Sequence, residues 1–170
     1  SNTNPQDEMH QLFEDIKKSH VGVLSEKDTI KLDQRSLYDI VTELQNYSLN
    51  RASRDAIGDA FEVFLGPSLR GNKGQFFTPK NVSEMMVLLA ELSFGEKIID
   101  PACGHGGILA NALIFLTNKE EYKEKEKYYI EGLNASLYGI DKDYFLSKIA
   151  RIYLMILGLQ RNNIFCENSL

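Results

Sequence analysis

Apolar residues in the first part of the chain recur every three or four positions. The pattern is clearest over residues 37–44 and 56–64, and it is typical of helices with one buried side. Ser53 is the expected N-cap of the helix that starts RDAIGDAFEVFL, and Gly66-Pro67 is its expected end. We therefore expect residues 1–70 to form an α-helical N-terminal region.

The pattern changes after this region, where short apolar runs alternate with longer helical stretches. The runs expected to be strands lie at 97–100, 136–141 and 163–168. The stretches expected to be helices lie at 81–92, 108–116 and 144–159, the first opened by Thr78-Pro79 and placing Met85 and Met86 in the core. This alternation predicts an α/β fold with a parallel, doubly wound sheet that has reached about three strands by residue 170.

The composition of the chain limits the classes of protein to which it can belong. With 170 residues and 43% hydrophobic content, the chain can bury a core. A net charge of -5 argues against a free-standing nucleic-acid binder, because phosphate contacts need clustered basic residues. Cys103 and Cys166 have neither metal-ligand nor disulfide spacing, so no metal site is expected.

The chain also lacks targeting signals. No apolar run reaches the roughly 20 residues that span a bilayer, and no leader-like segment opens the sequence, so we expect a cytoplasmic protein with no membrane partner. A start at Ser1 without Met, and an end just after an expected strand, are typical of a fragment of a longer protein.

The stretch IIDPACGHGG at 98–107 runs from a buried strand into a turn with three glycines. Glycine permits positive φ and removes the Cβ atoms that keep a ligand from the backbone, and the first strand-to-helix turn of such a sheet commonly faces a ligand. A dinucleotide fingerprint is disfavoured, because Leu109 stands where its third glycine belongs and Asp141 follows Asp100 by 41 residues instead of roughly 20. S-adenosylmethionine fits better, since Asp141 can accept its ribose hydroxyls while Asp100 and the turn hold its methionine end.

Three segments together resemble one family. GQFFTP at 74–79, IIDPACGHGGIL at 98–109 and YGIDKD at 138–143 are similar to the amino-terminal part of N6-adenine DNA methyltransferases, in particular the modification subunit of type I restriction-modification systems. The resemblance implies a Rossmann-like S-adenosylmethionine-dependent methyltransferase fold, with residues 71–170 as the first part of that domain. It implies a cofactor site formed by Gln75, Phe76, Phe77, Thr78, Pro79, Lys80, Asp100, Ala102, Cys103, Gly104, His105, Gly106, Gly107, Asp141 and Asn168, the last beside the adenine ring.

Two positions depart from the family pattern. His105 stands where a small polar residue is usual, and Asn168 where an Asp is frequent. We expect the His105 ring to point outward, because methyl transfer needs no general acid, and we expect Cys103 to be a small packed residue. Two other functions stay open: an assembly domain that has lost the cofactor, and a nicotinamide-dependent Rossmann enzyme.

The resemblance also implies a mechanism and partners. Family members flip the target adenine out of DNA and hold it with an Asn/Asp-Pro-Pro-aromatic motif, which we expect beyond residue 170, so this chain has no catalytic residue and is expected to be inactive alone. The parent protein would methylate adenine in double-stranded DNA together with a specificity subunit, a restriction subunit and a second copy of the modification subunit.

Overall fold

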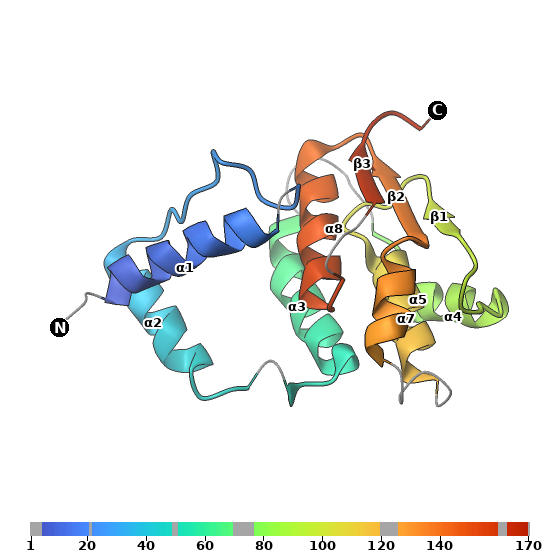
Figure 1. Ribbon diagram of the computed structural model, residues 1–170, viewed down its shortest axis with the longest axis horizontal. Coiled ribbons are helices and arrows are strands. Elements are labelled where there is room, and N and C mark those ends of the chain that lie inside the picture. The colour runs from blue at the N-terminus through green and yellow to red at the C-terminus, as the bar shows by residue number, and fades with distance from the viewer. Residues whose placement is uncertain are drawn as a thin grey trace. The chain divides into compact units, whose positions relative to one another are not determined.

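The computed structural model describes residues 5–20, 22–48, 51–69, 77–119, 126–159 and 163–169. Its elements, in chain order, are α1 (Pro5–Ser19), α2 (Gln34–Leu44), α3 (Arg54–Leu69), α4 (Lys80–Leu89), β1 (Ile98–Asp100), α5 (Gly107–Asn118), α7 (Glu126–Leu133), β2 (Leu137–Asp141), α8 (Tyr144–Ile156) and β3 (Asn163–Cys166) (Figure 1). No described helix is both long enough and apolar enough to cross a bilayer.

The chain divides into two compact units, Ser1–Ala52 and Ser53–Leu170. The helical periodicity up to residue 70 predicts that α3 belongs with the N-terminal helices. The structure groups α3 with the sheet instead, because Phe61 of α3 stacks on Tyr153 of α8, with ring centroids 4.2 Å apart. The Arg54 Nε–H also donates to the Leu157 carbonyl at 2.8 Å.

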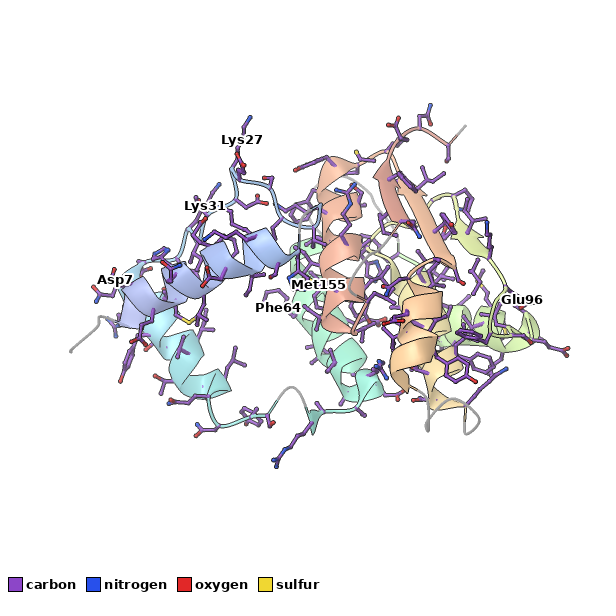
Figure 2. The ribbon with its side chains drawn as sticks, viewed as in Figure 1. Asp7, Lys27, Lys31, Phe64, Glu96 and Met155 are labelled. Atoms are coloured by element: carbon purple, nitrogen blue, oxygen red, sulfur yellow. The ribbon has the colours of Figure 1, made fainter. Side chains whose placement is uncertain are left out.

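The first unit consists of α1, α2 and the segment that joins them. Lys17 of α1 forms hydrogen bonds to that segment, which carries Lys27 and Lys31 (Figure 2). Its Nζ donates to the carbonyls of Glu26 and Asp28, each at 3.1 Å. These bonds satisfy backbone acceptors that have no helix or strand of their own.

Helix α3 begins as the sequence predicted and ends later. The Ser53 Oγ accepts the Ala56 N–H at 3.2 Å, which confirms the N-cap. The expected stop at Gly66-Pro67 is wrong, because α3 continues to Leu69. A proline removes one N–H from the helical ladder, and one missing bond does not by itself end a helix.

The sheet is parallel with strand order β1-β2-β3, which confirms the parallel α/β prediction. Ile98 pairs with Leu137, and Gly139 pairs with both Asp100 and Ile164. The connections run through α5 after β1 and through α8 after β2, as in crossover units.

One face of this sheet carries the core. Leu137 and Ile164 are buried there together with Leu109 of α5 and Leu154 of α8. Alternate strand residues point to the opposite face, where Phe165 is 49% exposed. The core therefore lies between the sheet and the layer that contains α5 and α8.

Helix α4 buries a different side from the one expected. Met85 and Met86 are 52% and 46% exposed, so placing them in the core was wrong. The buried residues are Ser83 and Val87, and the Ser83 Oγ accepts the side-chain amide of Asn111 on α5 at 2.5 Å. The side of α4 that faces α5 therefore combines a polar pair with the apolar Val87, and it is not the most apolar side of the helix.

Candidate functional site

The carboxyl ends of β1 and β2 bring two acids together. Asp100 ends β1 and Asp141 ends β2, and because the strands are parallel neighbours, both side chains lie at the same edge of the sheet. The glycine turn follows Asp100 at that edge. Parallel sheets of this kind bind ligands beyond the carboxyl ends of their strands.

Asp141 holds two loops at once. Its Oδ2 accepts the Gly104 N–H and its Oδ1 accepts the Asp143 N–H, both at 2.8 Å. Each carboxylate oxygen has a further lone pair, so Asp141 can hold the glycine turn and still accept hydroxyls from a ligand. Asp100 fixes the start of the same turn by accepting the Ala102 N–H at 3.1 Å.

The turn glycines serve different purposes. Gly104 has φ +54 and Gly106 has φ +87, a region that L side chains rarely adopt. A Cβ on Gly106 would lie 3.1 Å from the Cβ of Ala150 on α8, so Gly106 lets α5 and α8 approach closely. Gly106 is the N-cap of α5 and offers no side-chain cap, which leaves first-turn N–H groups of α5 for a ligand.

A cavity of about 600 Å³ opens over this edge. Its walls come from the segment before α4, the glycine turn, the loop after β2 and the residues after β3. The expected site residues that line it are Phe77, Thr78, Asp100, Ala102, Cys103, Gly104, His105, Gly107, Asp141 and Asn168.

Other expected site residues are not in this lining. Gln75 and Phe76 lie outside the described residues. Gly106 packs on α8, and Pro79 is the N-cap of α4. Lys80 pairs with Asp59 of α3 and lines a different cavity of about 370 Å³.

The cavity also has walls that we did not expect. These residues are Pro101, Ile108, Lys142, Asp143, Leu146 and Ser169. A signal for some of them was present in YGIDKD, because an Asp two residues after a strand end and just before an apolar helical stretch is typical of an N-cap. Asp143 caps α8 by accepting the Phe145 N–H at 2.8 Å, which places the first turn of α8 beside the cavity.

His105 does not point outward as expected. Its ring lies edge-on to Phe77, with centroids 4.8 Å apart and planes at 90°, and parallel to Tyr153 at 6.4 Å. Burial lowers the pKa of His105, so the ring is held in its neutral form. A neutral imidazole packed among aromatic rings acts as a wall of the cavity.

The two acids and Cys103 have perturbed ionisation. Burial raises the pKa of Asp100, and the negative charge of Asp141 raises it further, against the opposing bond from Ala102. Such a pair favours a ligand that carries positive charge. Cys103 is 5% exposed, which confirms it as a packed residue, and burial with two nearby carboxylates raises its pKa to about 12. Its thiol is therefore no nucleophile near neutral pH.

Leu109 explains why the turn departs from the dinucleotide pattern. The third glycine of that pattern allows a helix to pack closely on the sheet. Here Leu109 is fully buried. The room for close packing of helix on sheet comes from Gly139 of β2 instead, since a Cβ on Gly139 would lie 2.9 Å from Leu109 Cδ1.

Among the residues that the structure describes, no cluster of three or more His, Cys, Asp or Glu side chains could hold a metal ion.

Comparison with known proteins gives a consistent result. The Type I restriction enzyme EcoEI methylase subunit of Escherichia coli is 32% identical over 108 residues, which are 63% of this chain and 21% of that protein. The MjaIX methylase subunit of Methanocaldococcus jannaschii is 30% identical over 134 residues, or 76% of this chain and 22% of that one. The chain thus spans about a fifth of the length of these curated relatives.

A solved structure agrees with these relatives. It is a modification subunit assigned to a type I restriction enzyme of Vibrio vulnificus YJ016, and it superposes with a TM-score of 0.62 at 27% identity, over 78% of this chain and 28% of that one. This likeness confirms the Rossmann-like methyltransferase fold expected from the sequence. The family described as N-6 DNA Methylase matches residues 52–170. The chain therefore belongs to the N-6 DNA methylase family.

Proposed function

We propose that this chain is the S-adenosylmethionine-binding part of an adenine-N6 DNA methyltransferase subunit of a type I restriction-modification system. One observation carries the proposal: Asp100 and Asp141 converge with the glycine turn on a single cavity of about 600 Å³. The methylase subunits among its relatives support the same assignment.

The residues of the cavity suit the chemistry of this cofactor. Its methionine end carries an ammonium and a carboxylate, and its ribose carries two hydroxyls. Asp100 would receive the ammonium, the first-turn N–H groups of α5 would receive the carboxylate, and Asp141 would accept the hydroxyls. Asn168, in the loop after β3, and Leu146, in the first turn of α8, would flank the adenine ring.

The cofactor supplies a methyl group on a sulfonium, and the residues of this chain bind and orient it. Gln75, Phe76 and Pro79, in the GQFFTP segment, would complete the methionine side. Lys80 would not join them, because it pairs with Asp59 and lines the other cavity. The four prolines, at 5, 67, 79 and 101, are never adjacent, so no Pro-Pro motif for a flipped adenine is present. We accordingly name no catalytic residue and expect no methyl transfer to DNA by this chain alone.

The remaining assignments concern the parent protein. Double-stranded DNA would be its substrate, and a specificity subunit, a restriction subunit and a second modification subunit its partners. The net charge of -5 fits this division, because DNA recognition would then rest with another subunit. A cytoplasmic location follows from the same proposal.

Calorimetric titration of the 170-residue chain with S-adenosylmethionine tests the proposal, with NAD as the competing ligand. We expect saturable binding of S-adenosylmethionine alone, weakened in Asp141→Ala and in Asp100→Asn. Asp39→Asn, on the exposed part of α2, is the matched control and should bind as the parent chain does. A folded chain that binds neither ligand would favour the assembly-domain alternative, and one that binds NAD would favour the nicotinamide enzyme.

A further inference from the structure

The segment that precedes α4 has one described aromatic ring at the cavity, that of Phe77. Its Cε1 lies 3.5 Å from where a Cβ on Gly104 would stand, so the ring covers the face of the glycine turn. Phe77 is partly buried, and the segment from 77 to 79 belongs to no helix or strand. The backbone of Phe77 is therefore not held by the hydrogen bonds of a helix or a strand.

His105 is the side chain that meets Phe77 from the turn. The two rings are perpendicular with centroids 4.8 Å apart, an edge-to-face geometry that stabilises aromatic pairs. His105 in turn lies parallel to Tyr153, which is 1% exposed and stacks on Phe61. We call Phe61, Tyr153, His105 and Phe77 the aromatic row.

The inner end of the aromatic row is rigid. Tyr153 is buried on α8, and its hydroxyl donates to the Gly58 carbonyl of α3 at 3.4 Å. Tyr153 is therefore held by two helices. The His105 ring lies parallel to Tyr153, so the buried tyrosine helps to fix the position of His105. His105 in turn contacts Phe77, which is the outer end of the row.

We propose that His105 is a positioning residue, whose ring holds Phe77 over the glycine turn so that the cavity is closed on the methionine side before the cofactor arrives. This inference rests on the proposed function of the cavity. His105 acts through Phe77 and takes no proton in the reaction. A small side chain at position 105 would remove the ring between Tyr153 and Phe77, and Phe77 would keep only its packing on the cluster of Leu65 and Leu146.

Two variants of His105 separate ring packing from other roles. His105→Ser removes the ring, and we expect it to weaken S-adenosylmethionine binding by about two- to tenfold, the worth of one aromatic pair. His105→Phe keeps an aromatic ring without a titratable nitrogen and should restore the affinity. His10→Ser, in the first unit, is the matched control and should change nothing.

A double-mutant cycle shows whether His105 acts through Phe77. We expect His105→Ser to cause no further loss of affinity when Phe77→Ala is already present. Equal losses in both backgrounds would overturn the proposal, as would full affinity in His105→Ser or failure of His105→Phe to restore it. Urea unfolding of every variant shows whether a loss of affinity is a loss of folding.

A measurement without ligand keeps this inference distinct from the proposed function. In the NMR spectrum of the ligand-free chain, the His105 ring protons should shift when Phe77→Ala removes the neighbouring ring current. Absence of that shift would overturn the positioning role even in a chain that binds S-adenosylmethionine. A clear shift in a chain that binds no S-adenosylmethionine would instead overturn the proposed function and, with it, the role of His105 in binding.

Discussion

Gly139 lies at the centre of β2, where three buried side chains converge. A Cβ at this position would stand 2.7 Å from Ile164 Cδ1, 2.9 Å from Cys103 Sγ and 2.9 Å from Leu109 Cδ1. These neighbours are 3%, 5% and 0% exposed, so none can move into solvent. Gly139→Ala therefore adds one methyl group to a site that has no room for it.

The expected destabilisation follows from two opposing effects. Overpacking a well-packed core costs about 1–3 kcal/mol. Ala in place of Gly also lowers the entropy of the unfolded chain, which offsets about 0.4–1 kcal/mol of that cost. We expect Gly139→Ala to lower the free energy of unfolding by about 1–2 kcal/mol, or the midpoint of thermal unfolding by about 3–8 °C for a domain of this size.

A compensating variant makes this prediction specific to the contact. Ile164→Val removes the Cδ1 atom that lies closest to the new methyl group, and alone it should cost about 0.5–1.5 kcal/mol. In the double variant the two losses should fall short of their sum, because the second substitution relieves the first. Urea unfolding followed by circular dichroism measures all four chains. A Gly139→Ala chain as stable as the parent, or strictly additive losses, would refute the packing argument.

Three further predictions concern charge. Asp100→Asn keeps the acceptor for the Ala102 N–H and removes a buried charge, so it should raise the thermal midpoint while weakening S-adenosylmethionine binding about tenfold. Because burial raises the pKa of Asp100, the ionised carboxylate opposes folding. The difference in the free energy of unfolding between Asp100→Asn and the parent chain should therefore vanish as pH falls through that pKa. A difference that stays constant with pH would contradict this. Cys103, with its pKa raised to about 12, should resist iodoacetamide at pH 8 until urea unfolds the chain. Because the thiol is harder to ionise in the folded chain, the folded state should lose stability as pH rises from about 9 toward 12. Rapid labelling of Cys103 in the folded chain would contradict this prediction. Lys17→Met removes the donor to Glu26 and Asp28, so hydrogen exchange in the segment between α1 and α2 should accelerate, while exchange in β2 stays unchanged as the internal control.

Much of the fold was readable because local signals and the core agree. The strands at Ile98–Asp100 and Leu137–Asp141 stand within one residue of their expected starts, since short apolar runs that end in acids leave little choice. The expectation that the first of them is buried was wrong, because Ile99 is 61% exposed. The sequence misled us on α4, where four apolar residues are exposed and the buried side is marked by Ser83. Periodicity shows that a helix has an apolar side, but it does not show which neighbour that side meets. Here the buried side carries Val87 and the hydrogen bond from Asn111 to Ser83.

The candidate site shows the same limit more sharply. Acids at two strand ends and glycines in the turn between them could be recognised from spacing alone, and the structure brings Asp100 and Asp141 to one edge of the sheet. Spacing could not show what each residue does, because one residue type can serve packing, backbone conformation or ligand binding. Gly106 is needed as much for contact with Ala150 as for backbone that a ligand can approach.

The orientation of His105 depends on residues far away in the sequence. Its ring turns inward because Tyr153, 48 positions later, presents a buried aromatic face, and because Phe77 covers it from the other side. No local pattern around position 105 contains either fact. A side chain that departs from a family's usual residue can therefore support a site instead of weakening it, when the surrounding fold supplies aromatic partners that a small polar side chain cannot use. On this reasoning, the family-typical small polar residue at 105 would be the weaker choice in this chain, because it would leave Tyr153 and Phe77 without the ring that joins them.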